Sequence, residues 1–330
     1  MKNVSKLALF VAAGMMTAGA QAADFEVSDE TTVSVFGEME LRYKDENDSD
    51  GNGQTDFSDE GSLVGIGVEH ALSSNLTAFF STELEFDVLG ESDDIGRGAG
   101  SFGLEGDFGT LEIGDVDSVA EDALYDPIDP FESASPTGED YSSADSMVTF
   151  FSPSMNGLEI HAQARIKDDG DQDVTNDDGD ITTDNGTEVS LIGALIYDLG
   201  AVTLRAAYDN RGSVLDEDTN YESEDPIYGV SATFDLTDAL EVSVSYREQE
   251  NVDNSSVEAT AIGAVYDYGQ GDIYGTLQDV SPDAGDSRTE LALGVDYTLI
   301  GDLNTYAEYA AYDKADDADD IIEVGLRFEF

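Results

Sequence analysis

The chain has 330 residues, of which 74 are acidic and 13 basic, and its formal net charge is −61 at pH 7. This excess of negative charge excludes a nucleic-acid-binding protein, because contacts with phosphates require lysine and arginine. The absence of cysteine excludes disulfide bonds and thiolate metal sites. The 15 tyrosines and 15 phenylalanines argue against a disordered acidic chain, which would hold few aromatic residues.

The first 22 residues have the pattern of a secretory signal peptide. Two lysines precede an apolar run from Leu7 to Met16, and the segment ends in AQA, an A-x-A cleavage pattern. We therefore expect residues 1–22 to be removed on export and residues 23–330 to form a single domain. An uncleaved anchor is the alternative, although the apolar run is too short to cross a bilayer comfortably.

From Thr31 onward, polar and apolar residues alternate in long runs. In the first run, Met39, Leu41 and Tyr43 share one face, whereas Glu40 and Arg42 share the other. Such alternation is typical of β-strands with one apolar face and one wet face. The same pattern recurs at 76–88, 188–199, 201–209, 239–248, 290–299 and 321–330.

The connections between these runs also alternate in length. Short turns are expected near 71–75, 106–109, 152–157, 199–201, 236–239, 268–271 and 299–303. Long acidic loops are expected near 44–61, 88–98, 115–146, 168–186, 210–226, 249–257, 279–288 and 313–320. A soluble β-sandwich has no reason to gather its short turns at one end, whereas a bacterial outer-membrane barrel does so. The pattern predicts an all-β protein, a sixteen-stranded antiparallel transmembrane β-barrel.

The longest of these connections, from about Asp115 to Asp145, has a composition of its own. It is acidic and rich in proline and serine, and it carries apolar residues that a disordered linker would lack. These apolar residues are Val119, Leu124, Tyr125, Ile128 and Phe131. We expect this loop to fold inward, packed by its apolar side chains, and to present its acidic side chains to a channel.

Four stretches resemble the general porins of Gram-negative outer membranes, and their order and spacing match over the whole mature chain. They are VSVFGEMELRY, DFGTLEIGDVDS, SMVTFFSPSMNGLEIHAQA and the terminal VGLRFEF. The resemblance implies a homotrimer in the outer membrane, in contact with lipid and lipopolysaccharide, with the third outer loop folded into each pore. It also implies that Phe330 is the signal read by the barrel assembly machinery. Two departures are Gly114-Asp115, where many relatives have Gly-Arg, and DPIDPFES in place of a PEFGG-type motif.

The same resemblance suggests a pore constriction with acidic groups on the loop and basic groups on the wall. The candidate loop acids are Asp115, Asp117, Glu121, Asp122, Asp126, Asp129 and Glu132. The candidate wall residues are Arg42, Arg97, Arg165 and Arg205, and strand parity also directs Arg247, Arg288 and Arg327 inward. Alternatively, these arginines only neutralise wall acids such as Glu38, Glu40, Glu83 and Glu85.

One acidic loop resembles a calcium-binding loop. Its candidate ligands are Asp48, Asp50, Asn52, Asp56 and Asp59, at a spacing that could surround a Ca²⁺ ion with oxygen atoms. The last position holds aspartate in place of the usual bidentate glutamate, and no flanking helices are expected. A solvated acidic loop is the alternative interpretation.

Together these features predict a porin that prefers cations and lets small hydrophilic solutes diffuse passively, without a cofactor. A substrate-selective porin for sugars or amino acids is one alternative, and a secreted calcium-binding β-protein is another. A barrel enzyme is disfavoured, because neither His70 nor His161 lies in a recognisable catalytic motif. The acidic composition also suits a halophilic or marine source, since concentrated salt screens self-repulsion over a Debye length of ~3 Å at 1 M.

Overall fold

The computed structural model describes residues 23–47, 53–90, 95–136, 147–166, 173–175, 181–183, 189–211, 213–215, 222–224, 226–250, 255–283, 285–312 and 320–330. Within these ranges, no helix is both long enough and apolar enough to cross a membrane.

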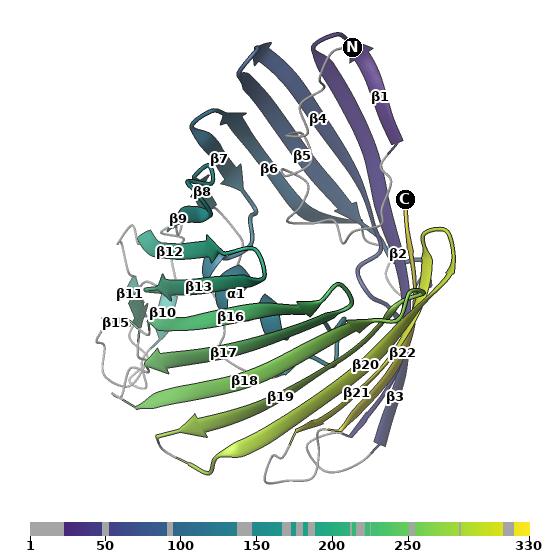
Figure 1. Cartoon of the computed structure of the whole chain (residues 1–330), viewed down its shortest axis with the longest axis vertical. Helices are drawn as coiled ribbons and strands as arrows, with labels where there is room; N and C mark the ends of the chain where they lie inside the picture. The colour runs from purple at the N-terminus through teal and green to yellow at the C-terminus, as the bar shows by residue number, and fades with distance from the viewer. Residues whose placement is uncertain are drawn as a thin grey trace.

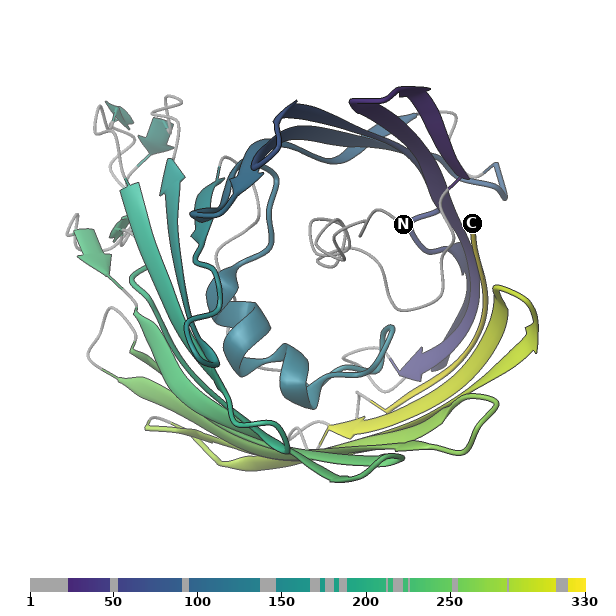
Figure 2. The same cartoon turned by 45° about the horizontal axis from the view of Figure 1, so that its top comes forward.

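Antiparallel strands follow one another around a closed barrel (Figures 1 and 2). The wall has sixteen strand positions, as the alternation predicted, and β3 and β4 lie end to end in one of them. The strands are β2 (Thr31–Asn47), β3 (Gly53–Asp59), β4 (Leu63–Ser73), β5 (Leu76–Glu85), β6 (Gly96–Gly106), β7 (Gly109–Gly114), β8 (Met147–Phe151), β9 (Leu158–Ile166), β12 (Val189–Asp198), β13 (Val202–Asp209), β16 (Ile227–Thr237), β17 (Leu240–Glu250), β18 (Ser256–Asp267), β19 (Asp272–Pro282), β20 (Arg288–Ile300), β21 (Leu303–Tyr312) and β22 (Ile321–Glu329).

Short hairpins extend two of the long connections. They are β10 (Asp173–Thr175) with β11 (Ile181–Thr183), and β14 (Ser213–Leu215) with β15 (Glu222–Glu224). At the other end of the barrel the described connections are tight, such as residues 74–75 between β4 and β5 and residues 301–302 between β20 and β21. The predicted difference in length between the two ends is confirmed for these connections.

The barrel closes where β2 pairs with the last strand. Residues 38–46 of β2 pair with β22, and residues 31–38 pair with β4. The strand β1 (Ala23–Ser28) pairs with residues 31–35 of β2, so it continues the line of β22 along the same edge. Phe330 fixes this seam, because its backbone N–H and C=O bond to Gly37 at 3.0 and 2.9 Å.

The two faces of the wall differ as the alternation predicts. On β2, Tyr43 is 47% exposed on the outer face, whereas Glu40, on the inner face, is 4% exposed. Along the other strands, leucine, isoleucine, valine and aromatic side chains cover the outside, and buried polar side chains such as Gln163 and Gln278 line the inside. An apolar outer surface with a polar interior is the arrangement that a barrel needs in lipid.

Several inward-pointing aromatic rings lie over a glycine of the next strand. The pairs are Phe36 with Gly65, Phe79 with Gly103, Tyr274 with Gly294 and Tyr306 with Gly325. A Cβ atom on each of these glycines would come within 2.0–2.2 Å of the ring. The missing side chains therefore provide the space in which the rings lie flat against the wall.

Candidate functional site

The segment from Asp115 to Pro136 leaves β7 and lies against the inner wall. It contains α1 (Val119–Leu124) and the 3-10 helix η1 (Asp126–Ile128), and Figure 2 shows α1 inside the ring of strands. Ser118 begins the helix, since its side chain accepts a hydrogen bond from the Ala120 N–H at 3.3 Å. Such an N-cap satisfies one of the free amide groups of the first turn.

The apolar face of α1 is fully buried against strands of the wall. Val119, Ala120, Ala123 and Leu124 form one cluster with residues of β8, β12 and β13, which are Met147, Ile192, Ala194 and Ala207. Burial of this face favours a fixed position for the helix, since apolar area removed from water stabilises by roughly 25 cal/mol per Å².

Polar side chains of the wall hold the backbone of this segment. Gln163 donates to the Asp117 carbonyl at 2.8 Å. Ser231 and Ser245 donate at 2.6 Å to the carbonyls of Ala123 and Leu124, and Thr276 donates to that of Ile128 at 2.5 Å. Carbonyls at the end of a short helix have no partner within the helix, so these hydroxyl groups replace water there.

The far end of the segment is fixed by one carboxylate. Glu308 of β21 accepts hydrogen bonds from three successive backbone N–H groups, those of Glu132, Ser133 and Ala134, at 2.9, 3.2 and 3.0 Å. The Tyr274 hydroxyl also donates to Glu308, at 2.8 Å. One acceptor group on the wall thus holds three successive amide groups of the segment.

The predicted loop acids lie along this segment, outside the membrane-spanning strands. Burial, reinforced by the neighbouring carboxylates Asp126 and Asp117, raises the pKa of Glu121 to about 7 and that of Asp122 to about 8. Burial also raises the pKa of Asp129 to about 7, although hydrogen bonds from Ser135 and Phe131 oppose the shift.

The remaining loop acids, Asp115, Asp117, Asp126 and Glu132, differ in their surroundings. Burial raises the pKa of Asp117, and that of Asp126 despite the positive charge of Arg205. Burial raises the pKa of Glu132 as well, although Arg327 opposes the shift. The Asp115 N–H donates to the Gly100 carbonyl at 3.0 Å, at the point where the segment leaves β7.

The predicted wall arginines differ in their contacts with the segment. Arg42 forms ion pairs with Glu60 and Glu323 and donates to the Ser133 hydroxyl at 2.8 Å. Arg327 forms an ion pair with Glu132 of the segment. The structure thus brings these two arginines together with the segment, and each already has a carboxylate partner.

Arg247 also contacts the segment, through the ring of Tyr125, whereas Arg205, Arg165 and Arg97 are arranged differently. Arg205 lies on β13 and donates to Thr233 at 2.8 Å. Arg165 lies inward on β9, since it is paired in register with the buried Met147. Arg97 is exposed and lies opposite the outward-facing Leu84 across a bulge, so the structure does not bring it together with the segment.

Sequence reasoning missed the wall residues that hold the segment. Glu308, Tyr274, Ser231, Ser245 and Thr276 are polar groups on the inner face, and strand parity alone does not distinguish them from their neighbours. The helix itself had a detectable signal. Ser118 is followed by Glu121 with the S-x-x-E spacing of a capping box, and apolar residues follow.

The proposed calcium ligands are only partly described. Asp48, Asp50 and Asn52 lie outside the described residues. Asp56 is exposed on β3, and the Asp59 carboxylate accepts hydrogen bonds from the backbone and side chain of Ser62 at 2.9 and 2.7 Å. In the described part of the chain, no group of three or more potential ligand residues could hold a metal ion.

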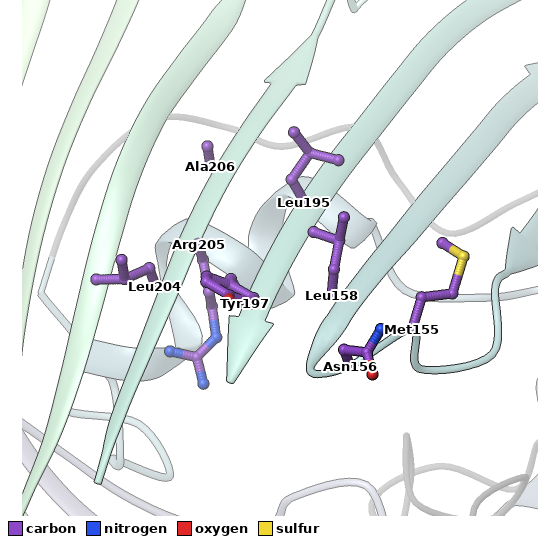
Figure 3. Close-up of a pocket in the computed structure, with 8 residues that line it drawn as sticks. All are labelled: Met155, Asn156, Leu158, Leu195, Tyr197, Leu204, Arg205 and Ala206. Atoms are coloured by element: carbon purple, nitrogen blue, oxygen red, sulfur yellow. The ribbon is translucent and has the colours of Figure 1, made fainter. Parts of the chain in front are cut away.

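A pocket of about 470 Å³ lies near the short turn that follows β8 (Figure 3). Its lining is Met155, Asn156, Leu158, Leu195, Tyr197, Leu204, Arg205 and Ala206. Leu195, Tyr197 and Leu204 are exposed on the outer face of the barrel. The pocket therefore faces away from the segment that carries the acidic groups.

An antiparallel barrel with an apolar outside and a polar inside is the architecture of a transmembrane β-barrel of the bacterial outer membrane. The chain matches the family described as Gram-negative porin over residues 8–326, and it belongs to that family. It is 29% identical to a monosaccharide porin of Halomonas sp and to a major outer membrane protein of Halomonas elongata. Each alignment covers 98% of this chain and 99% of the relative.

Solved porins share the fold at lower sequence identity. An anion-selective porin from Comamonas acidovorans superimposes with a TM-score of 0.74 at 15% identity, covering 91% of this chain and 100% of that one. OmpF of Salmonella typhi superimposes with a TM-score of 0.70 at 18% identity, and the match covers 93% of this chain and 100% of that one. The trimer form of OmpT from Vibrio cholerae superimposes with a TM-score of 0.66 at 16% identity, and the match covers 92% of this chain and 100% of that one.

Proposed function

We propose that this porin forms a water-filled, cation-preferring channel for the passive diffusion of ions and small hydrophilic solutes. Residues 115–136, described above, form its constriction. Selectivity then follows from the size of the opening and the field of the charged groups beside it.

The charge balance of the constriction carries this proposal. Residues 115–136 contain seven carboxylates and no lysine or arginine. Four wall arginines lie near the segment, namely Arg42, Arg205, Arg247 and Arg327, and two of them, Arg42 and Arg327, are already in ion pairs with glutamates. The net field is therefore negative, and acidic rings in a low-dielectric channel favour cations.

The test is the reversal potential of the purified protein in a planar bilayer under a KCl gradient. We expect a potential of the sign given by potassium permeation, and a lower cation preference after neutralising Asp115, Asp117, Glu121 and Asp122 to Asn or Gln. A control variant neutralises Glu26 and Glu30, which are exposed near the short-turn end. Anion preference in the wild type, or unchanged selectivity in the fourfold variant, contradicts the proposal.

A sugar-selective channel is a second candidate, supported by the similarity to the monosaccharide porin of Halomonas sp. A selective pore would bind its solute, so neutral hexoses would reduce the potassium current in a saturable way. A general diffusion pore would pass hexoses in liposome swelling assays without saturation, at rates set by solute size. The two measurements separate the candidates on the same preparation.

Assembly belongs to the same proposal. We infer a homotrimer, in line with the trimer form of OmpT, in contact with lipid and lipopolysaccharide. Phe330, which bonds to Gly37 at the seam, would be the signal for the barrel assembly machinery. Cross-linking of unheated protein should give a trimer, and deletion of Phe330 should lower its amount in the outer membrane.

The acidic composition is consistent with a halophilic source, since both curated relatives come from Halomonas.

We also propose that residues 1–22 are removed when the protein is exported. N-terminal sequencing of the membrane-inserted protein tests this, because it should begin at Ala23.

A further inference from the structure

Three buried oxygen-bearing side chains meet at the seam of the barrel. The Tyr306 hydroxyl on β21 lies 2.5 Å from Glu40 on β2 and 2.9 Å from Glu323 on β22. Tyr306 and Glu40 are each 4% exposed, and Glu323 is fully buried. Both contacts are therefore shielded from bulk solvent.

The position of Tyr306 depends on the missing side chain of Gly325. The two residues are paired in register, and the ring lies where a Cβ atom of Gly325 would be, 2.1 Å from its Cε1 and Cζ atoms. Gly325 is paired in turn with Arg42 of β2. The phenol thus crosses a whole strand, and its hydroxyl reaches a carboxylate two strands away.

The number of protons at this site does not match the number of contacts. A phenol has one O–H proton, and an ionised carboxylate can only accept hydrogen bonds. If both glutamates were ionised, one of the two contacts would set a carboxylate oxygen against the lone pairs of the phenol oxygen. Such an unsatisfied contact between buried acceptors is costly.

We propose that Glu40, Tyr306 and Glu323 form a proton-binding site that holds one proton at neutral pH in addition to that of the phenol. The Glu40 carboxylic acid donates to the Tyr306 oxygen, and Tyr306 donates to the Glu323 carboxylate. Glu323 carries the negative charge because Nη1 of Arg42 lies 3.6 Å from its other oxygen.

The surroundings favour retention of the proton. Acidic groups from every neighbouring element face this region, with two guanidinium groups among them. The acids are Glu38 on β2, Glu60 before β4, Glu132 on the inner segment, Glu308 on β21 and Glu329 on β22, and the guanidinium groups belong to Arg42 and Arg327. Like charges nearby disfavour a further ionised carboxylate.

The site is linked to the inner segment. Arg42 contacts Glu323 and also donates to the Ser133 hydroxyl at 2.8 Å. Loss of the proton at alkaline pH places a second negative charge beside this arginine. The cation preference of the channel should then increase in a step separate from the titration of the acids on the segment.

Infrared spectroscopy of the folded protein tests the site directly. The wild type should show a carbonyl band of a protonated carboxylic acid at neutral pH that disappears on alkaline titration. Subtracting the spectrum of Glu40→Gln or of Glu323→Gln should isolate this band. In either variant the amide can donate to the phenol oxygen, so the shared proton is no longer required. Exposed Glu30→Gln is the matched control and should keep the band.

The outcomes are distinct. A difference band between the wild type and each of the two variants supports the site, whereas the absence of this difference band with either of them overturns the sharing of one proton. In Gly325→Ala, which displaces the ring without changing a titratable group, the band should disappear at a lower pH than in the wild type. An unchanged titration in folded Gly325→Ala contradicts the bridging role of Tyr306, as does an unchanged titration in Tyr306→Phe. None of these results depends on the ion selectivity of the pore.

Discussion

The guanidinium carbon of Arg247 lies 4.9 Å from the centre of the Tyr125 ring. Arg247 is fully buried on β17 and donates to Gln278 of β19 at 2.5 Å. Tyr125 follows α1, and its hydroxyl donates to the Pro136 carbonyl. A cation over an aromatic ring therefore joins the inner segment to the wall near its middle.

Substitutions of Tyr125 should separate the contributions of the ring and the hydroxyl. Tyr125→Phe keeps the ring and loses the hydrogen bonds of the hydroxyl with the Pro136 carbonyl and with Asp129, which should cost about 0.5–1.5 kcal/mol each in the free energy of unfolding. Tyr125→Leu also loses the cation–π contact, for a further ~0.5–2 kcal/mol. Urea unfolding of the detergent-solubilised protein measures both values. Equal destabilisation by the two variants would contradict a role for Arg247.

Glu308 should keep the far end of the segment in its fixed conformation. Glu308→Ala leaves the N–H groups of Glu132, Ser133 and Ala134 without their shared acceptor. Hydrogen exchange at these amides, followed by mass spectrometry, should become faster, while exchange in β21 itself should change little. The control is Glu26→Ala, an exposed site. Protection that survives in Glu308→Ala would show that other contacts suffice.

Ion selectivity should change near neutral pH. A carboxyl group is charged above its pKa, and the pKa is raised to about 7 for Glu121 and Asp129 and to about 8 for Asp122. Cation preference should therefore rise between about pH 6 and 9, and it should already be reduced at pH 6. Reversal potentials across this range measure the change. A transition confined to pH 4 would indicate ordinary, solvated carboxylates.

Glycines beneath aromatic rings should be sensitive to a single methyl group. Gly103→Ala places a Cβ 2.2 Å from the Phe79 ring, whereas Gly67→Ala meets only the Ser34 Cβ, at 3.7 Å. Overpacking of this kind typically costs 1–3 kcal/mol. We expect Gly103→Ala to lower the refolding yield and the unfolding midpoint, and Gly67→Ala to change them little. The added Cβ would also lie 2.6 Å from the Leu111 carbonyl oxygen, so equal behaviour of the two variants would argue that both the ring and this strand move aside freely.

Much of the fold could be predicted, because the alternation of apolar and polar residues assigns each residue of a strand to the inner or the outer face of the wall. The opposite faces of Tyr43 and Glu40 follow directly from alternation on β2. Arg97 shows where this reasoning fails, since a bulge shifts the register between Thr82 and Leu84 and pairs Arg97 with an outward residue. A bulge adds one residue to one strand, and the composition of the strand does not reveal it.

The candidate site was predictable only in part. Acidic and apolar residues of the segment indicated its two faces, and Val119, Leu124 and Ile128 are indeed fully buried. Its attachment depends on contacts such as Glu308 with Ala134, which are far apart in the sequence. Which inward glutamate meets which amide is set by the tilt and stagger of the whole barrel, so local patterns do not contain this information.

The seam has a consequence for the order of events during biogenesis. Because β2 is among the first strands to be synthesised and β22 is the last, the pairing of Glu38 with Glu329 joins opposite ends of the polypeptide. The wall therefore cannot close before both of these strands are present. Until they pair, both β2 and β22 present unpaired strand edges, which are templates for aggregation.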